Sequence, residues 1–196
     1  MEPKPILPAG RRELTKAQNR ETILAAAARV FAQLGLAGAT VRDIIRATPL
    51  ASGTFYNYFK SKEEVYQALR DEVALKLRPR LREARAGTET AEAFLAQSFR
   101  AFFQFVAESG ETSGGPERLR MDSPEVLAGF AELKEDIEAA QARGLLPPAD
   151  AAMLTSALVG VAFELAERVK SAGDVEAMTA FATALFLGGI GTLPKL

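Results

Sequence analysis

Residues 52–58 hold polar and aromatic side chains whose chemistry suits contact with another molecule better than burial in a core. Small residues at the start of this segment let a backbone approach base edges closely, and the hydroxyl and amide groups that follow suit phosphates and bases. The candidate contacts of the segment are Ser52, Gly53, Thr54, Tyr56, Asn57 and Tyr58.

Further candidates for anion contact flank this segment. Lys60 and Lys62 stand at an expected helix start, where a cation suits a phosphate better than it suits the helix dipole. Thr40 precedes another expected helix, whose first amide groups favour an anion. Arg42 lies on that helix, and a solvated helix face explains it as well as DNA contact does.

The composition excludes most common catalytic chemistry. The 196 residues include no His and no Cys, so imidazole bases, thiol nucleophiles and thiolate-bound metals are excluded. Glu135, Asp136 and Glu138 could serve as acids or bases, but they fall on the polar side of an amphipathic helix. No P-loop, nucleophile motif or metal cluster accompanies them. We therefore expect no enzyme, no catalytic residue, no metal site and no cofactor.

The elements that must position residues 40–62 are short helices. The sequence predicts one helix from Thr40 to about Ala47, a break at Pro49, and a second helix from about Ala51 to Phe59. A longer helix over 15–34, ended by Gly35, would support both. This is helix-turn-helix geometry, in which the second helix enters the major groove of DNA.

Residues 23–69 resemble the DNA-binding domain of the TetR family of bacterial transcriptional repressors. The resemblance is carried by Phe31–Gly35 (F-x-x-x-G), by Thr40–Ile44 (T-V-R-D-I) and by residues 53–62 (GTFYNYFKSK). It implies a dimer with a ligand-binding carboxyl-terminal body, and repression that is relieved by a small molecule. It also implies phosphate contacts by Thr40, Tyr58 and Lys62. The residues at or near the bases would be Ser52, Gly53, Thr54, Tyr56 and Asn57.

The turn departs from the family pattern. Pro49-Leu50-Ala51 stands where the family usually has Gly-Val-Ser. Proline cannot adopt the positive φ that glycine permits, so we expect a different turn conformation.

Helical periodicity continues through the rest of the chain and predicts an all-α protein of about nine helices. We expect a flexible arm over 1–14, a three-helix DNA-binding domain over 15–62, and a larger helical ligand-binding and dimerisation domain over 63–196. Ser61 would begin the connecting helix.

The charged residues are divided at the same boundary as the predicted domains. Residues 1–62 hold ten basic and four acidic residues, although the whole chain carries a formal charge of −1. A basic segment attached to an acidic body suggests that one end meets a polyanion.

The effector candidates are apolar residues of the carboxyl-terminal helices. Ordinary core packing explains this Phe-rich cluster when it is taken alone, while the family resemblance implies that it partly lines a pocket. The candidates are Phe99, Phe102, Phe103, Met121, Leu127, Phe130, Leu158 and Phe163.

The last two helices are rich in small residues, which permit close helix approach. The resemblance implies that they form a homodimer interface, and internal packing is the alternative. The longest uncharged run, 177–194, is interrupted by glycines and leaves too little helix to cross a bilayer. We therefore expect a cytoplasmic protein with no membrane partner.

The leading hypothesis is a homodimeric repressor that binds a near-palindromic double-stranded operator and responds to a small effector. A helical protein-interaction module without DNA binding is the alternative, but such a helix would show an apolar stripe. At the amino terminus, Arg11, Arg12 and Lys16 could reach a phosphate or the minor groove. A disordered arm explains them equally well.

Overall fold

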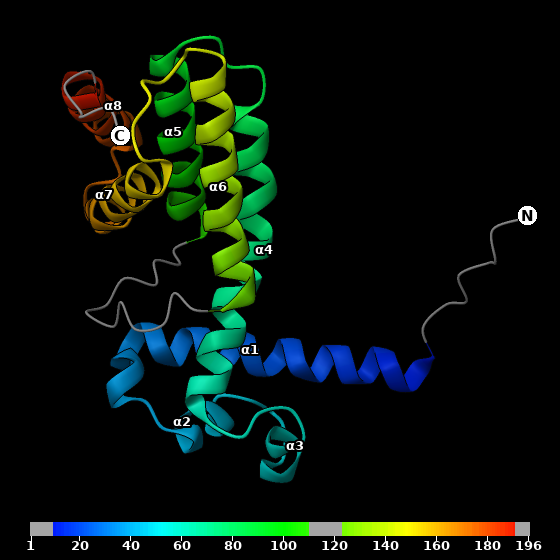
Figure 1. Ribbon diagram of the computed structural model, residues 1–196. Helices are drawn as coiled ribbons and strands as arrows, with labels where there is room; N and C mark the ends of the chain where they lie inside the picture. Colours follow the sequence, from blue (N-terminus) through cyan, green and yellow to red (C-terminus); the bar gives the residue numbers. More distant parts are fainter. Residues whose placement is uncertain (1–9, 110–122, 191–196) are drawn as a thin grey trace, which may run out of the picture. The chain divides into compact units, whose positions relative to one another are not determined.

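The computed structural model describes residues 10–109 and 123–190, and every regular element in these ranges is an α-helix (Figure 1). The predicted all-α class is confirmed, with eight helices in the described residues where about nine were expected. Their bounds are α1 Arg11–Gly38, α2 Val41–Arg46, α3 Ser52–Tyr56, α4 Lys62–Arg85, α5 Ala91–Ser109, α6 Pro124–Ala142, α7 Ala151–Ala172 and α8 Val175–Ile190.

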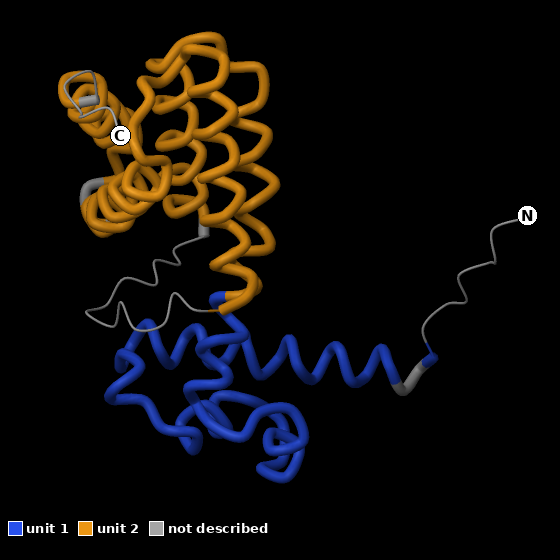
Figure 2. The backbone as a smooth tube through the Cα atoms, in the orientation of Figure 1, with its two compact units in different colours: residues 1–70 blue, residues 71–196 orange. Residues whose placement is uncertain are grey.

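The chain divides into two compact units, residues 1–70 and residues 71–196 (Figure 2). The division falls within α4 rather than after residue 62. The reason is that the first turns of α4 pack into the amino-terminal core through Val65, Ala68 and Leu69. We call the two parts the amino-terminal unit and the carboxyl-terminal unit.

The first helix starts earlier and runs further than expected. It begins at Arg11 rather than Thr15, and the Gly10 amide donates to the Glu13 carboxylate at 3.3 Å, which satisfies a group at the helix start. The expected arm over 1–14 is therefore helical from residue 11, while residues 1–9 lie outside the described residues. Gly35, which was expected to end the helix, has φ +67° and kinks it, and α1 continues to Gly38.

The core of the amino-terminal unit joins all four of its helices. Apolar residues at helical spacing on α1 pack against one fully buried residue from each of α2, α3 and α4. The buried members are Ile23, Leu24, Ala27, Val30, Ala39, Ile44, Phe55, Phe59 and Val65. Because α2 and α3 are too short to be stable alone, this packing is what holds them.

The turn between α2 and α3 is held by a threonine hydroxyl. The Thr48 hydroxyl donates to the Ile45 carbonyl at 2.9 Å and accepts from the Leu50 amide at 3.3 Å. Leu50 packs against the amino-terminal core, and Ala51 enters α3 with φ −69°. The Pro49-containing turn thus forms without the glycine that the family pattern carries.

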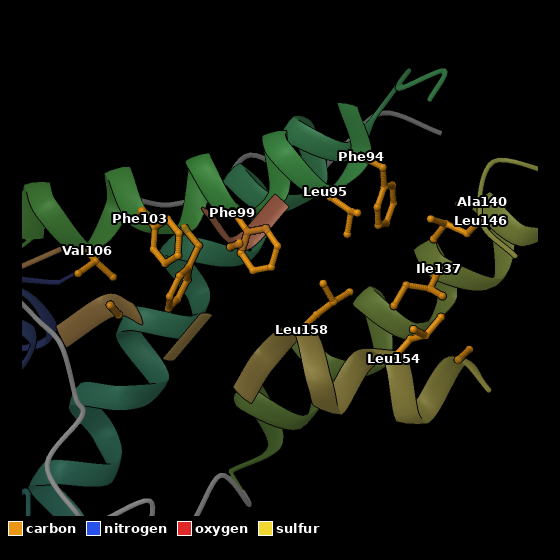
Figure 3. Packing of buried hydrophobic residues seen from close by; sticks show 14 of the residues in the cluster. Phe94, Leu95, Phe99, Phe103, Val106, Ile137, Ala140, Leu146, Leu154 and Leu158 are labelled. Carbon is orange, nitrogen blue, oxygen red and sulfur yellow. The ribbon is translucent and has the colours of Figure 1, made fainter. Parts of the chain in front are cut away.

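The carboxyl-terminal unit packs α5 to α8 around a core rich in phenylalanine. Figure 3 shows side chains of α5, among them Phe99 and Leu95, directed toward α6 and α7. Pro79 lies inside α4, and the helix continues past it to Arg85. No described helix is long and apolar enough to cross a membrane.

Candidate nucleic-acid interface

Helix α3 presents one buried and one exposed side. Phe55 is buried, while Ser52, Gly53, Tyr56 and Asn57 are exposed. Tyr56 keeps 58% of its surface accessible, although its ring meets the Phe55 ring edge-on at 5.4 Å between centroids. Four of the predicted base contacts therefore share one open surface, and Thr54 is half-buried beside them.

Gly53 leaves the open surface of α3 without a projecting side chain at this position. A Cβ added at Gly53 would meet no atom within 4 Å, and the residue has no positive φ that requires glycine. The fold of this chain therefore does not need a glycine there. What the missing side chain provides is close approach of the backbone to a partner.

Thr40 is engaged within its own helix end. Its hydroxyl donates to Asp43 Oδ2 at 2.5 Å and accepts from the Asp43 amide at 3.2 Å, and its own amide donates to Oδ2 at 3.0 Å. These two hydrogen bonds from Thr40 hold the pKa of the Asp43 carboxyl below its usual range. The expected anion site at the start of α2 thus already contains a carboxylate. The Thr-x-x-Asp spacing was a capping-box signal for Asp43 that the sequence reading missed.

The side chain of Lys62, an expected phosphate contact, is held within the amino-terminal unit. Its ammonium donates to three carbonyls after the kink in α1, those of Leu36 (2.7 Å), Ala37 (3.2 Å) and Ala39 (2.9 Å). An ammonium has three protons, so these bonds use its full donor capacity. Lys62 therefore caps the end of α1 and fixes the approach to α2.

The remaining expected phosphate contacts differ in exposure. Arg42 and Lys60 are exposed, whereas Tyr58 is half-buried and packs against the amino-terminal core. Ser61 caps α4, since its hydroxyl accepts from the Glu64 amide at 3.1 Å. The Glu64 carboxylate accepts from the Lys60 amide at 2.6 Å rather than from the Ser61 amide, as it would in a capping box.

The effector candidates fall into three groups. Phe99, Phe102, Phe103 and Leu158 are buried in the carboxyl-terminal core, with Phe163 packed against it. Phe130 is half-buried and Leu127 is 50% exposed, so Leu127 points away from this core. Met121 lies outside the described residues.

The aromatic candidates contact one another. Phe99 stacks on Phe103 with centroids 5.9 Å apart, and Phe102 meets Phe163 edge-on at 5.5 Å. Phe186 of α8, which the sequence reading missed, joins Phe99 at 5.7 Å. Phe186 follows the helical periodicity of α8, but periodicity does not show that this face meets α5.

Two of the three acidic residues considered for catalysis, Asp136 and Glu138, form ion pairs. Asp136 accepts from buried Arg85 at 2.7 Å, and Glu138 pairs with Lys134 one helical turn away. The described residues contain no group of three or more His, Cys, Asp or Glu that could hold a metal ion. Fold and site together define a helix-turn-helix protein.

Comparison with known proteins gives a family match for the helix-turn-helix region. Residues 23–69 match the family model of bacterial regulatory proteins, tetR family. The transcriptional repressor KstR2 of Mycolicibacterium smegmatis is 46% identical over 56 residues, which are 28% of this chain and 27% of KstR2. The amino-terminal part of the chain is therefore similar to the tetR family of bacterial regulatory proteins.

Solved structures extend the likeness to the whole fold. The fatty acid degradation regulator FadR from Bacillus halodurans is 24% identical, with a TM-score of 0.72 over 95% of this chain and 98% of its own. FadR from Bacillus subtilis, solved in complex with stearoyl-CoA, is 23% identical, with a TM-score of 0.70 over 87% and 98%. The helical carboxyl-terminal unit is therefore part of the shared fold.

Proposed function

We propose that the protein is a transcriptional repressor that binds a near-palindromic operator as a homodimer and is released by a small apolar effector. The observation that carries the proposal is the open polar surface of α3, held in place by buried Phe55. The family match to residues 23–69, which include α3, supports the same conclusion. Because its target is chromosomal DNA, we place the protein in the bacterial cytoplasm.

The last two helices support the homodimer. On α8, the exposed residues from 177 onward carry no charge, and Phe181 (58%) and Leu185 (52%) expose large apolar surface in the single chain. On α7, Met153 is 68% exposed. Apolar surface of this extent at small-residue helices fits burial against a second copy. In such a dimer, two copies of α3 about 34–36 Å apart would read successive turns of DNA.

The aromatic core of the carboxyl-terminal unit supports an apolar effector. Phe99, Phe102 and Phe103 already contact other rings, so a bound molecule would have to separate some of them. Separation of the rings would give a conformer that differs from the free form. The effector would bind this conformer more tightly than the DNA-binding form, and that difference in affinity would drive release of the protein from DNA. Stearoyl-CoA, present in the Bacillus subtilis structure, is the first ligand to test.

A mobility-shift assay tests DNA binding. Duplexes selected from a random library by the purified protein, together with DNA from upstream of its gene, are titrated across a salt series. We expect a sequence-specific shift whose affinity falls steeply with salt. If no duplex gives a specific shift, the repressor hypothesis is wrong and the interaction-module alternative gains support.

Gly53→Ala probes the reading surface with a single methyl group. The methyl would enter open space in the free protein, so the melting temperature should be unchanged or slightly higher. On DNA it should prevent close approach and weaken specific binding about tenfold, or by about 1.4 kcal/mol. Unchanged affinity in the same assay would show that DNA does not approach α3 at Gly53.

A further inference from the structure

The first turns of α1 extend beyond the core of the amino-terminal unit. Residues 13–18 are all exposed, and the first buried residue of the helix is Ile23. At 1.5 Å per residue, the stretch from Arg11 to Arg20 is about 14 Å long. Figure 1 shows this part of α1 continuing past α2 and α3 toward the amino terminus. We call residues 13–20 the α1 extension.

Two cations of the extension share the side of α1 that is buried further along. Lys16 and Arg20 precede Ile23 and Ala27 at successive spacings of four, three and four, which keeps all of them on one face of an α-helix. Ile23 and Ala27 are fully buried against the other helices of the unit. Where the helix leaves the core, this face therefore changes from apolar to basic.

A cation–π contact locates the basic face. The Arg20 guanidinium lies over the Phe59 ring, 5.7 Å from its centroid. Phe59 is buried and lies in the chain between α3 and α4. The exposed Lys60 follows it directly. Within the amino-terminal unit, Arg20 thus links the α1 extension to Phe59, which directly follows the candidate contact residues 52–58.

We propose that the α1 extension contacts the phosphate backbone of DNA that flanks the sequence read by α3, with Lys16 as its principal contact. The proposal rests on the proposed DNA-binding function and enlarges its footprint. The phosphate backbone is the partner that charge complementarity favours, since residues 1–62 hold ten basic against four acidic residues. Such a contact adds affinity without adding sequence preference.

The test compares Lys16→Glu with Arg29→Glu in the full chain. Arg29 is also exposed on α1. It follows Lys16 by thirteen residues, so it lies roughly 140° around the helix from Lys16. Both variants change the charge equally. On a selected operator with ten added flanking base pairs, Lys16→Glu should lower affinity about tenfold and reduce the salt slope by about one per subunit. Arg29→Glu should bind like the wild type, and neither should lower the melting temperature.

Shortening the operator flanks gives a second reading. The affinity of the wild type should fall when the added base pairs are removed, whereas the affinity of Lys16→Glu should change little. If Lys16→Glu binds the long operator with wild-type affinity and slope, or if Arg29→Glu weakens it as much, the extension does not contact the flank. In both cases the operator is still bound, so the proposed function stands. A wild type that binds no duplex overturns both proposals.

Discussion

Lys60 and Lys62 stand two residues apart in a segment that the sequence marks as basic, yet their surroundings differ. Lys60 has an exposed side chain, and its amide donates to Glu64. The Lys62 ammonium is enclosed by three carbonyls at the end of α1. At the scale of the residue, the same ion serves as a candidate phosphate contact at one position and as a helix cap at the other.

Substituting each lysine by methionine separates the two roles. Lys62→Met leaves three carbonyls without their donor, and we expect it to reduce the free energy of unfolding by about 1–3 kcal/mol. The salt slope of DNA binding should not change, since no phosphate contact is lost. Lys60→Met should leave the melting temperature unchanged and reduce the salt slope by about one per subunit.

Thermal denaturation and salt-dependent binding assays on both variants check this assignment, and Lys62→Arg is the control that keeps the charge. A guanidinium offers donors to the same carbonyls, so Lys62→Arg should recover part of the stability. If Lys62→Met instead melts like the wild type and reduces the salt slope, the lysine contacts phosphate on DNA and its place at the α1 end is incidental.

At the scale of the element, α4 and α6 are joined by ion pairs along matching faces. Arg78 bonds to Glu125 at 3.0 Å and also to Glu132, which accepts from Arg82 at 2.8 Å. The last pair, Arg85 with Asp136, involves a guanidinium that is almost fully buried. Gly129 lies beside this arrangement, and a Cβ there would be in van der Waals contact with Arg78 Cγ at 3.4 Å.

These pairs predict a pH dependence of stability. The hydrogen bond from Arg78, followed by the nearby charges of Arg78 and Arg82, holds the pKa of Glu132 below its usual range. A carboxyl with a lowered folded-state pKa stabilises the fold above its unfolded pKa, near 4.3, and loses that contribution as the pH falls through the folded value.

Glu132→Gln should therefore be less stable than the wild type at pH 7, by about 1–2 kcal/mol, and the difference should shrink as the pH falls below about 4. Urea denaturation of both proteins between pH 7 and pH 3 measures it. Glu63→Gln, at an exposed carboxyl of the same length, controls for the loss of a charge. A constant difference between wild type and Glu132→Gln across this range would contradict the electrostatic explanation.

At the scale of the molecule, the proposed dimer depends on apolar surface of α8. Phe181→Glu places a charge where the single chain exposes a phenyl ring, and we expect it to shift the protein toward monomer with at least a tenfold weaker dimerisation constant. Sedimentation velocity over a concentration series measures the change. Leu75→Glu, at a similarly exposed leucine of α4, is the control and should sediment like the wild type. If Phe181→Glu also does, the dimer uses another surface.

Charge is distributed to suit the same function. The chain as a whole is nearly neutral, but its first 62 residues are basic and the remainder is acidic. An acidic body is repelled by phosphates, so the distribution would help to orient the dimer with its recognition helices toward the operator.

Much of this fold follows from local sequence. Helical periodicity predicted the all-α class, and the glycines that follow α6 and α7, Gly144 and Gly173, have positive φ. The exposed face of α3 was equally readable, since Phe55 alone among its residues is large and purely apolar. These features depend on residues within one or two turns of each other, which is the range that a sequence pattern records.

The parts that could not be read depend on residues distant in the chain. Lys62 and the carbonyl of Leu36 are separated by 26 positions, and Arg85 and Asp136 by 51. The sequence by itself determined an all-α chain with a helix-turn-helix segment, a basic amino-terminal part and no imidazole or thiol chemistry. Only the tertiary structure decided which lysine is a cap and which phenyl rings meet, because each depends on what packing places beside a side chain.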